Sequence, residues 1–222
     1  MTSPDDAPFD PSDPTRPARA PKPRDAATLI LIKDAARAPK VLMGQRAKGH
    51  VFMPDKWVFP GGRVDPGDAR AAASSELSSA DEALISLGTR RAPRAFALAA
   101  VRETWEETGL KVGGVAGPSL ADLAFICRAI TPPYRPRRFD AHFFLAEAEA
   151  VLANDRPVAG PELLHTEWFP MAAALALDLP NVTRFVLGEV AARLAGERPA
   201  PPFLRWTRTG HRMDRLVLSC PT

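Results

Sequence analysis

The sequence has no long hydrophobic run, and this absence removes one class of protein at once. No stretch of about eighteen apolar residues occurs in the chain, so no membrane-spanning helix is predicted. The start of the chain also lacks a basic segment followed by an apolar one, so no secretory signal is predicted. We therefore expect a cytoplasmic protein that does not contact a membrane.

Cysteine and net charge are also scarce. The two cysteines, Cys127 and Cys220, match no zinc-ligand spacing, and neither predicts a functional site. The formal net charge is +3, which suits an anionic substrate but is too small to predict nucleic acid as a partner. What the sequence does contain is enough apolar residues, 45%, to fill the core of one domain.

Proline is concentrated at the start of the chain. Residues 1–25 hold seven prolines among charged and small residues, so we predict a disordered or extended arm. Residues 26–222 form the predicted single domain. It opens with two apolar segments, 26–33 and 41–45, which predict two strands joined by a hairpin-like turn.

The stretch 98–110 carries the residues that most strongly indicate a functional site. On a helix, Glu103, Glu106 and Glu107 fall within about 100° of one another. The opposite face carries the apolar side chains, Leu98, Val101 and Trp105. Neighbouring carboxylates repel one another unless a cation lies between them, and hard oxygen ligands suit Mg²⁺ or Mn²⁺. Arg102 can orient one of these carboxylates without occupying a metal position.

The context of this helix favours a metal site over a solvated surface. A helix face rich in arginine and glutamate is more often simply solvated, so the helix alone does not decide the question. Val58 and Phe59, however, predict the end of a buried strand, and Gly61–Gly62 predicts a bend where backbone carbonyls approach a ligand closely. Gly109 predicts the C-terminal end of the helix.

Together these segments resemble the Nudix box, Gx5Ex7REUxEExGU. Gly62 and Asp68 match its first part, and residues 102–110, RETWEETGL, match its second part almost completely. Asp68 replaces the first glutamate of the box but can still pair with Arg102, and Thr104 replaces an aliphatic residue. About 26 extra residues separate the two parts. Because closing a longer loop costs only slightly more free energy, such an insertion is tolerated if its ends meet.

The split box, with FMP upstream and RRFDAHFF downstream, resembles the Nudix subgroup that contains the peroxisomal coenzyme A diphosphatases and many bacterial relatives. The resemblance covers residues 26–195 and implies the α+β class and a Nudix fold, a mixed β-sheet sandwiched between α-helices. It also implies a metal-dependent hydrolase, with Mg²⁺ or Mn²⁺ as cofactor. The expected small-molecule substrate is a nucleoside diphosphate linked to another moiety, cleaved at its diphosphate linkage.

The identity of that moiety stays open. The subgroup points to coenzyme A or acyl-CoA, but residues 47–58 lack the arginine that many coenzyme A-specific members carry there. Nucleotide sugars, dinucleotides and oxidised nucleotides are the alternatives. A non-catalytic Nudix-fold module that binds nucleotide or nucleic acid is a rival from another class, although such modules generally lose the box carboxylates that this chain has kept.

The resemblance also implies roles for individual residues. Glu106 and Glu107 are the expected primary metal ligands, with Glu103 as a third ligand or as the base that orients water, and Gly62 beside them in the metal site. Arg102 is expected to support these carboxylates.

Candidates outside the box come from the loops. Arg46 and Arg138 are expected to contact substrate phosphate, although each also fits a solvated surface position. Glu162 is the candidate for an additional metal-binding or base carboxylate, and Glu167 is the reserve. His50 is a weaker candidate for a general base.

The insertion inside the box, residues 69–93, predicts a short helix from its apolar spacing, with Ser78 or Ser79 as a cap. We expect its apolar side to pack on the domain or on a second copy in a homodimer, and a lid over the substrate is the less favoured alternative. The remaining predicted elements are strands over 120–130 and 139–146, a helix over 181–195 and a hairpin, without an assigned function, over 203–218.

Overall fold

The computed structural model describes residues 17–47, 55–154, 156–158, 160 and 162–218. Within these ranges the strands are β1 (Arg24–Lys33), β2 (Lys40–Arg46), β3 (Trp57–Val58), β4 (Gly61–Arg63), β5 (Ala124–Ile130), β6 (Phe139–Glu147), β7 (Leu163–Pro170), β8 (Pro202–Thr207) and β9 (Gly210–Arg215). The α-helices are α1 (Ser79–Ser86), α2 (Pro93–Thr108), α3 (Ala148–Val151), α4 (Met171–Ala176) and α5 (Asn181–Leu194). No helix in this part of the chain is long and apolar enough to cross a membrane.

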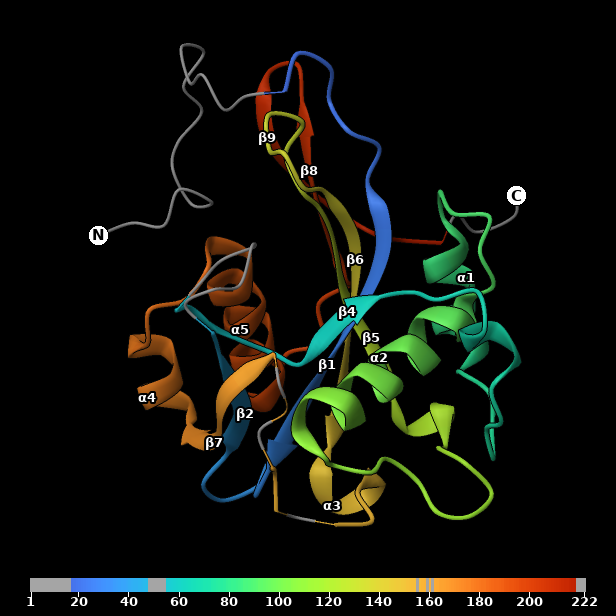
Figure 1. Cartoon of the computed structure of the whole chain (residues 1–222), viewed down its shortest axis with the longest axis vertical. Coiled ribbons are helices and arrows are strands. Elements are labelled where there is room, and N and C mark those ends of the chain that lie inside the picture. Colours follow the sequence, from blue (N-terminus) through green and yellow to red (C-terminus); the bar gives the residue numbers. More distant parts are fainter. Residues whose placement is uncertain (1–16, 48–54, 155, 159, 161, 219–222) are drawn as a thin grey trace.

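The strands form one mixed sheet with the order β3-β2-β1-β6-β5-β8-β9. β1 runs parallel to β6, and β5 runs parallel to β8. The other edge of β1 is shared by two partners, since Ala26–Thr28 pairs with β4 and Ile32–Lys33 pairs with β2. Figure 1 shows β4 in the middle of the molecule, next to α2. The split edge of β1 therefore brings Gly61–Gly62 beside the helix that carries the glutamates.

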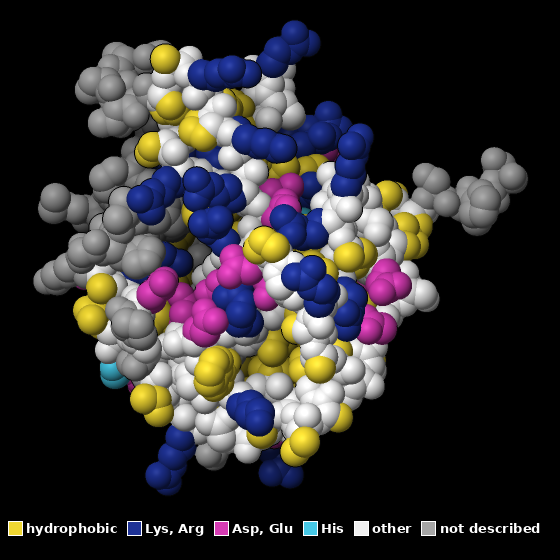
Figure 2. Space-filling model, turned by 45° about the vertical axis from the view of Figure 1, so that its right-hand side comes forward, with side chains coloured by type: hydrophobic (Ala, Val, Ile, Leu, Met, Phe, Trp, Pro, Cys, Tyr) yellow, Lys and Arg dark blue, Asp and Glu magenta, His cyan; other side chains and the backbone are white. Residues whose placement is uncertain are grey.

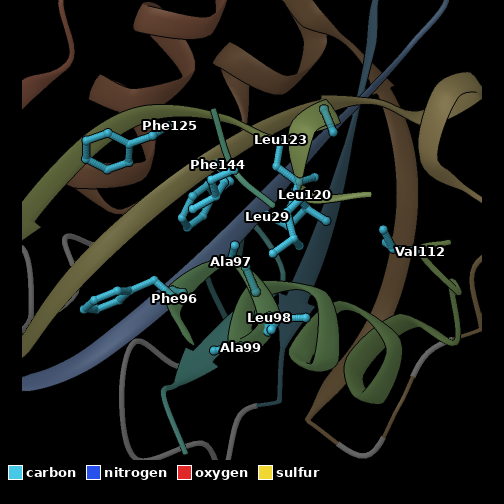
Figure 3. Close-up of a cluster of buried hydrophobic side chains, with 14 of the residues drawn as sticks. Leu29, Phe96, Ala97, Leu98, Ala99, Val112, Leu120, Leu123, Phe125 and Phe144 are labelled. Atoms are coloured by element: carbon cyan, nitrogen blue, oxygen red, sulfur yellow. The ribbon is translucent and has the colours of Figure 1, made fainter. Parts of the chain in front are cut away.

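Helices cover both faces of the sheet, and β1 shows why. Ala27, Leu29 and Leu31 belong to the core that includes residues of α1 and α2. Ile30 and Ile32 belong to a second core, which includes residues of α4 and α5. Figure 3 shows part of the first core, with Leu29, Phe96, Ala97 and Phe144. A strand that is apolar on both faces needs cover on both sides, and the observed mixed sheet between helices confirms the predicted fold class.

Most predicted boundaries lie close to the observed ones. β1 begins at Arg24, so the last two residues of the predicted arm belong to the sheet, and residues 1–16 lie outside the described residues. The strand predicted over 120–130 is wrong in its first part. Leu120–Asp122 forms a 3₁₀ turn, in which the Leu123 N–H donates to the Leu120 carbonyl and both leucines reach the core.

The face of α2 that packs on the sheet differs from the prediction. Trp105, assigned to the apolar face of the helix, is 58% exposed, whereas Thr104 and Glu107 are buried. The helix presents Ala97 and Ala100 in its buried surface, and small side chains let a helix approach a sheet closely. The substitution of Thr104 for an aliphatic residue is accommodated because its hydroxyl donates to the Ala100 carbonyl at 2.8 Å. The buried surface of α2 therefore combines the large side chains of Phe96 and Leu98 with small ones, and Trp105 lies outside it.

The insertion packs on its own domain. Leu77 and Ile85 lie in the first core, and the Ser78 hydroxyl caps α1 by accepting from the Asp81 N–H, as predicted. Arg128 on β5 donates to the carbonyls of Leu87 and Gly88 and so fixes the end of α1. These contacts confirm the expectation of packing on the domain.

His142, on β6, gives a testable pH dependence. Its side chain is fully buried against Phe96, with ring centroids 3.9 Å apart, and neither ring nitrogen has a hydrogen-bond partner among the described residues. Burial lowers the pKa of His142 from 6.5 to about 4. Between these values the unfolded chain binds a proton that the folded chain does not, so stability falls by up to about 3 kcal/mol as the pH falls.

We expect the His142→Leu variant to lose this part of the pH dependence, because leucine does not titrate. The measurement is urea unfolding at several pH values between about 7 and 4. The matched control is His165→Leu on β7, where the histidine side chain is 58% exposed. Equal acid sensitivity in His142→Leu and the wild type would contradict the assignment.

Candidate active site

Gly61 and Gly62 lie in strand β4, so the bend predicted at these two residues is wrong. The strand meets helix α2 through two glutamates. The Gly61 N–H donates to Glu107 Oε2 at 2.8 Å. A Cβ atom at Gly62 would overlap the Glu103 carboxylate, so only glycine leaves room for that side chain. The helix ends where predicted, since Gly109 has φ 66° and its N–H donates to the Trp105 carbonyl. Glu103 and Glu107 therefore both direct their carboxylates at the two glycines of β4.

Arg102 organises the same cluster. Its Nε donates to Asp68 Oδ1 at 2.9 Å and its Nη2 to Asp68 Oδ2 at 3.2 Å, which confirms the predicted pairing. Its Nη1 donates to Glu103 Oε1 at 2.9 Å and to Glu106 Oε2 at 3.1 Å. Its Nη2 also donates to the Arg63 carbonyl. One guanidinium therefore forms hydrogen bonds with strand β4, with the 3₁₀ turn at Asp68 and with helix α2. These contacts raise the pKa of Arg102, with the Asp68 hydrogen bond as the largest cause.

The carboxylates are in an environment that disfavours their charge. Burial raises the pKa of Glu107 to about 8. The hydrogen bond from Gly61 and the positive charge of Arg46 act in the opposite direction and lower this pKa. Burial also raises the pKa of Glu103, against its hydrogen bond with Arg102. The negative charge of Glu162 also raises the pKa values of Glu103 and Glu107, so Glu162 lies close enough to interact with both carboxylates.

Strands β2 and β7 bring Arg46 and Glu162 to this cluster. Arg46 pairs with Leu163 in the sheet, and the Ala47 N–H donates to the Glu162 carbonyl at 3.4 Å. Arg46 is surrounded by the charges of Glu107, Glu162 and Glu103, and burial lowers its pKa. The structure thus brings Arg46 and Glu162 near the box carboxylates, and their roles stay predictions.

These residues open into a cavity of about 1010 Å³. Its acidic end is lined by Gly61, Gly62, Glu103, Glu106 and Glu162, together with Arg46 and Arg102. Glu107 lies behind this wall and is only 3% exposed. Figure 2 shows Asp and Glu side chains gathered in the middle of one face, with Lys and Arg side chains beside and above them. No residue of the insertion 69–93, all of which is described, lines the cavity, so the lid alternative receives no support.

The donor set fits a divalent cation. The carboxylates supply hard oxygen ligands, the absence of a Cβ at Gly62 leaves the space that Glu103 uses, and a nearby cation would favour the charged form of Glu103 and Glu107. As the side chains stand, no three Asp, Glu, His or Cys residues in the described ranges converge on one metal position. Arg102 keeps the carboxylates of Glu103 and Glu106 from a shared metal position, because its Nη1 donates to both of them.

Two of the sequence candidates lie elsewhere. The Arg138 guanidinium donates to the carbonyls of Thr131 and Pro21 and does not line the cavity, so the loop before β6 presents Arg135 and Arg137 in its place. Glu167, the reserve carboxylate, is on the surface with His165 at 3.2 Å. His50 and Cys220 lie outside the described residues.

The other end of the cavity was not predicted from the sequence. Its wall includes Trp206 and His211 from the β8–β9 hairpin and Thr183 and Phe185 from α5. The apolar alternation of the hairpin predicted its strands correctly but gave no sign that its side chains face a cavity.

Comparisons with known proteins agree with this geometry. The NUDIX domain family matches residues 93–187, which include α2 and the second part of the box. A NUDIX hydrolase from Alicyclobacillus acidocaldarius is 29% identical, with a TM-score of 0.60 over 77% of this chain and 92% of that one. The chain therefore has the Nudix fold, and it is similar to Nudix hydrolases. Enzymes of this type act on pyrophosphate bonds.

Two further crystal structures show the same fold at lower identity. The NUDIX domain of Shewanella oneidensis NrtR, complexed with ADP ribose, is 15% identical, with a TM-score of 0.51 over 84% of this chain and 94% of that one. A MutT protein from Bacillus halodurans is 16% identical, with a TM-score of 0.52 over 86% of this chain and 97% of that one. The curated proteins contain no match to this chain. These two structures therefore support the Nudix fold and do not test the coenzyme A subgroup.

Proposed function

We propose that the protein hydrolyses the diphosphate linkage of a nucleoside diphosphate joined to a second moiety, with the help of Mg²⁺ or Mn²⁺. The observation that carries the proposal is the convergence of Glu103 and Glu107 on Gly61 and Gly62 of β4, at a cavity edge that also holds Glu106, Glu162 and Arg46. Carboxylates for a cation and an arginine for a phosphate thus lie at one place.

The roles follow from the positions of the side chains. Glu103 and Glu106 line the cavity and, with Glu107 and the backbone at Gly62, would hold the cation. When bound, a divalent cation neutralises phosphate oxygens and lowers the pKa of a coordinated water. To join the metal site, Glu106 would turn away from Arg102, and the bidentate contact with Asp68 would keep Arg102 in place.

The remaining charged residues would complete the reaction. Arg46 would bind an oxygen of the diphosphate, because it faces the cavity between the carboxylates and β7. Glu162 would accept a proton from the attacking water, as a carboxylate outside the metal cluster. Attack on phosphorus then breaks one P–O bond of the bridge, and each product keeps a phosphate.

The substrate class stays broader than coenzyme A. A cavity of about 1010 Å³ is at the upper end of the usual range for small ligands, which favours a substrate with a group on each side of the diphosphate. Coenzyme A, nucleotide sugars, ADP-ribose and dinucleotides all meet this description. Homodimer formation also stays a prediction.

The test is a screen of diphosphate compounds with purified protein in Mg²⁺ or Mn²⁺. The panel contains coenzyme A, ADP-ribose, a nucleotide sugar and a dinucleotide, and release of phosphate is measured after coupling to a phosphatase. We expect metal-dependent cleavage of at least one compound and loss of cleavage with EDTA. Cleavage of none of them, or cleavage that persists in EDTA, would refute the proposed reaction.

A further inference from the structure

The far end of the cavity is built by segments that the box does not include. Tyr134 lies in the loop between β5 and β6, and Trp206 lies on β8. Figure 1 shows this loop beside the β8–β9 hairpin at one end of the molecule. Both aromatic side chains line the cavity, and both are half-buried. The hairpin lies beyond residues 93–187, which match the NUDIX domain family.

The Trp206 indole is held in a defined orientation. The Tyr134 ring lies 5.1 Å from it at an interplanar angle of 82°, and the His211 ring lies 4.6 Å from it at the same angle. Edge-to-face contacts of this kind are favourable and restrict rotation of the ring. Because the backbones of β8 and β9 pair Trp206 with His211 directly, the position of the indole is also fixed by the sheet.

The rest of this end combines apolar and cationic groups. Leu204 and Phe139 supply apolar wall, and Arg135 and Arg137 supply positive charge. The Arg135 guanidinium lies 5.1 Å from the Tyr134 ring centroid, within reach of a cation–π contact. An aromatic surface next to arginines suits a flat, π-rich group attached to phosphate.

We propose that Trp206 and Tyr134 form the nucleobase subsite of this enzyme, so that the C-terminal hairpin selects substrates that carry a nucleoside. This inference rests on the proposed function, because the diphosphate of the same substrate lies at the acidic end of the cavity. Trp206 stacks on the base, Tyr134 and His211 hold the indole, and the arginines of the β5–β6 loop interact with the attached phosphates.

Binding measurements test the subsite without bond cleavage. The two probes are α,β-methylene-ADP, in which carbon replaces the bridging oxygen, and methylenediphosphonate, which has no nucleoside. Both are titrated calorimetrically into the protein with Mg²⁺. We expect Trp206→Ala to weaken binding of α,β-methylene-ADP by about 5- to 150-fold, the usual range for losing one stacked base, and to leave methylenediphosphonate binding unchanged.

Two further variants separate stacking from general damage. Trp206→Phe keeps an aromatic ring and should stay within about threefold of the wild type for α,β-methylene-ADP. Met213→Ala removes a 47%-exposed side chain of the same hairpin that does not line the cavity, and it should bind both probes as the wild type does.

Three outcomes would overturn the subsite. The first is that Trp206→Ala binds α,β-methylene-ADP with the affinity of the wild type. The second is that this variant loses affinity equally for both probes. The third is that the wild type does not bind α,β-methylene-ADP. If nucleoside-dependent binding through Trp206 is found but no diphosphate in the screen is hydrolysed, the subsite stands and the proposed reaction fails.

Discussion

Replacing Glu106 by glutamine is expected to lower kcat for the best diphosphate substrate by about 10²- to 10³-fold or more. Glutamine keeps the size of the side chain but loses the negative charge that a cation needs. Glu106 lines the cavity, and its side chain is 47% exposed, so its carboxylate is accessible to a metal ion and to substrate. The measurement is steady-state kinetics over a range of Mg²⁺ concentrations.

The same variant should fold normally. The contact that Glu106 makes in the structure is an exposed ion pair with Arg102 at 3.1 Å, and such pairs contribute about 0–1 kcal/mol. We therefore expect the midpoint of thermal unfolding to change by less than about 4 °C. A large fall in activity with a small change in stability would separate a catalytic role from a structural one.

Glu167→Gln is the matched control. Glu167 is also an exposed glutamate, but it lies on β7 beside His165 and outside the cavity. Its replacement should leave kcat within about twofold of the wild type, because no charge near the reaction changes. If Glu106→Gln keeps near-normal turnover, or if Glu167→Gln loses as much, the assignment of the metal site to α2 is wrong.

The local chemistry of the site was predictable because the box encodes it in short segments. Gly109 was expected to end α2 from its position after the last glutamate, and the structure shows this left-handed cap. The pairing of Arg102 with Asp68 was expected from the box although 33 residues lie between them. In the structure, Arg94 on α2 holds the start of the insertion near the helix by donating to the carbonyls of Ala69 and Ala71. Neither inference needed the path of the whole chain.

The parts that depend on tertiary packing were not predictable. Trp105 was assigned to the apolar face of the helix, but the buried surface of α2 in the structure does not include it. Arg138 was chosen over Arg135 and Arg137 without knowing which of them turns back to the backbone. Trp206 reaches Tyr134 because β8 lies parallel to β5, a pairing between distant segments that no local pattern reports.

The second large effect on activity is expected from replacing Gly62 in strand β4. Gly62→Ala introduces a Cβ that would overlap the Glu103 carboxylate, so Glu103 must leave its position. Displacing a catalytic group by about 1 Å can cost about 100-fold in rate, and we expect at least that loss in kcat. Gly67→Ala is the matched control, because a Cβ there meets no atom within 4 Å, and it should retain full activity.

A double-mutant cycle shows whether the clash with Glu103 is the cause. In the wild-type background, Gly62→Ala should lower the free energy of unfolding by about 1–3 kcal/mol through overpacking, and in the Glu103→Ala background it should cost much less. Gly61→Ala gives the contrast, because its Cβ would meet the backbone of Ala27 and Thr28, and removing Glu103 does not relieve that clash. Equal destabilisation by Gly62→Ala in both backgrounds would show that the glycine serves the pairing of β4 with β1 instead of making room for the carboxylate.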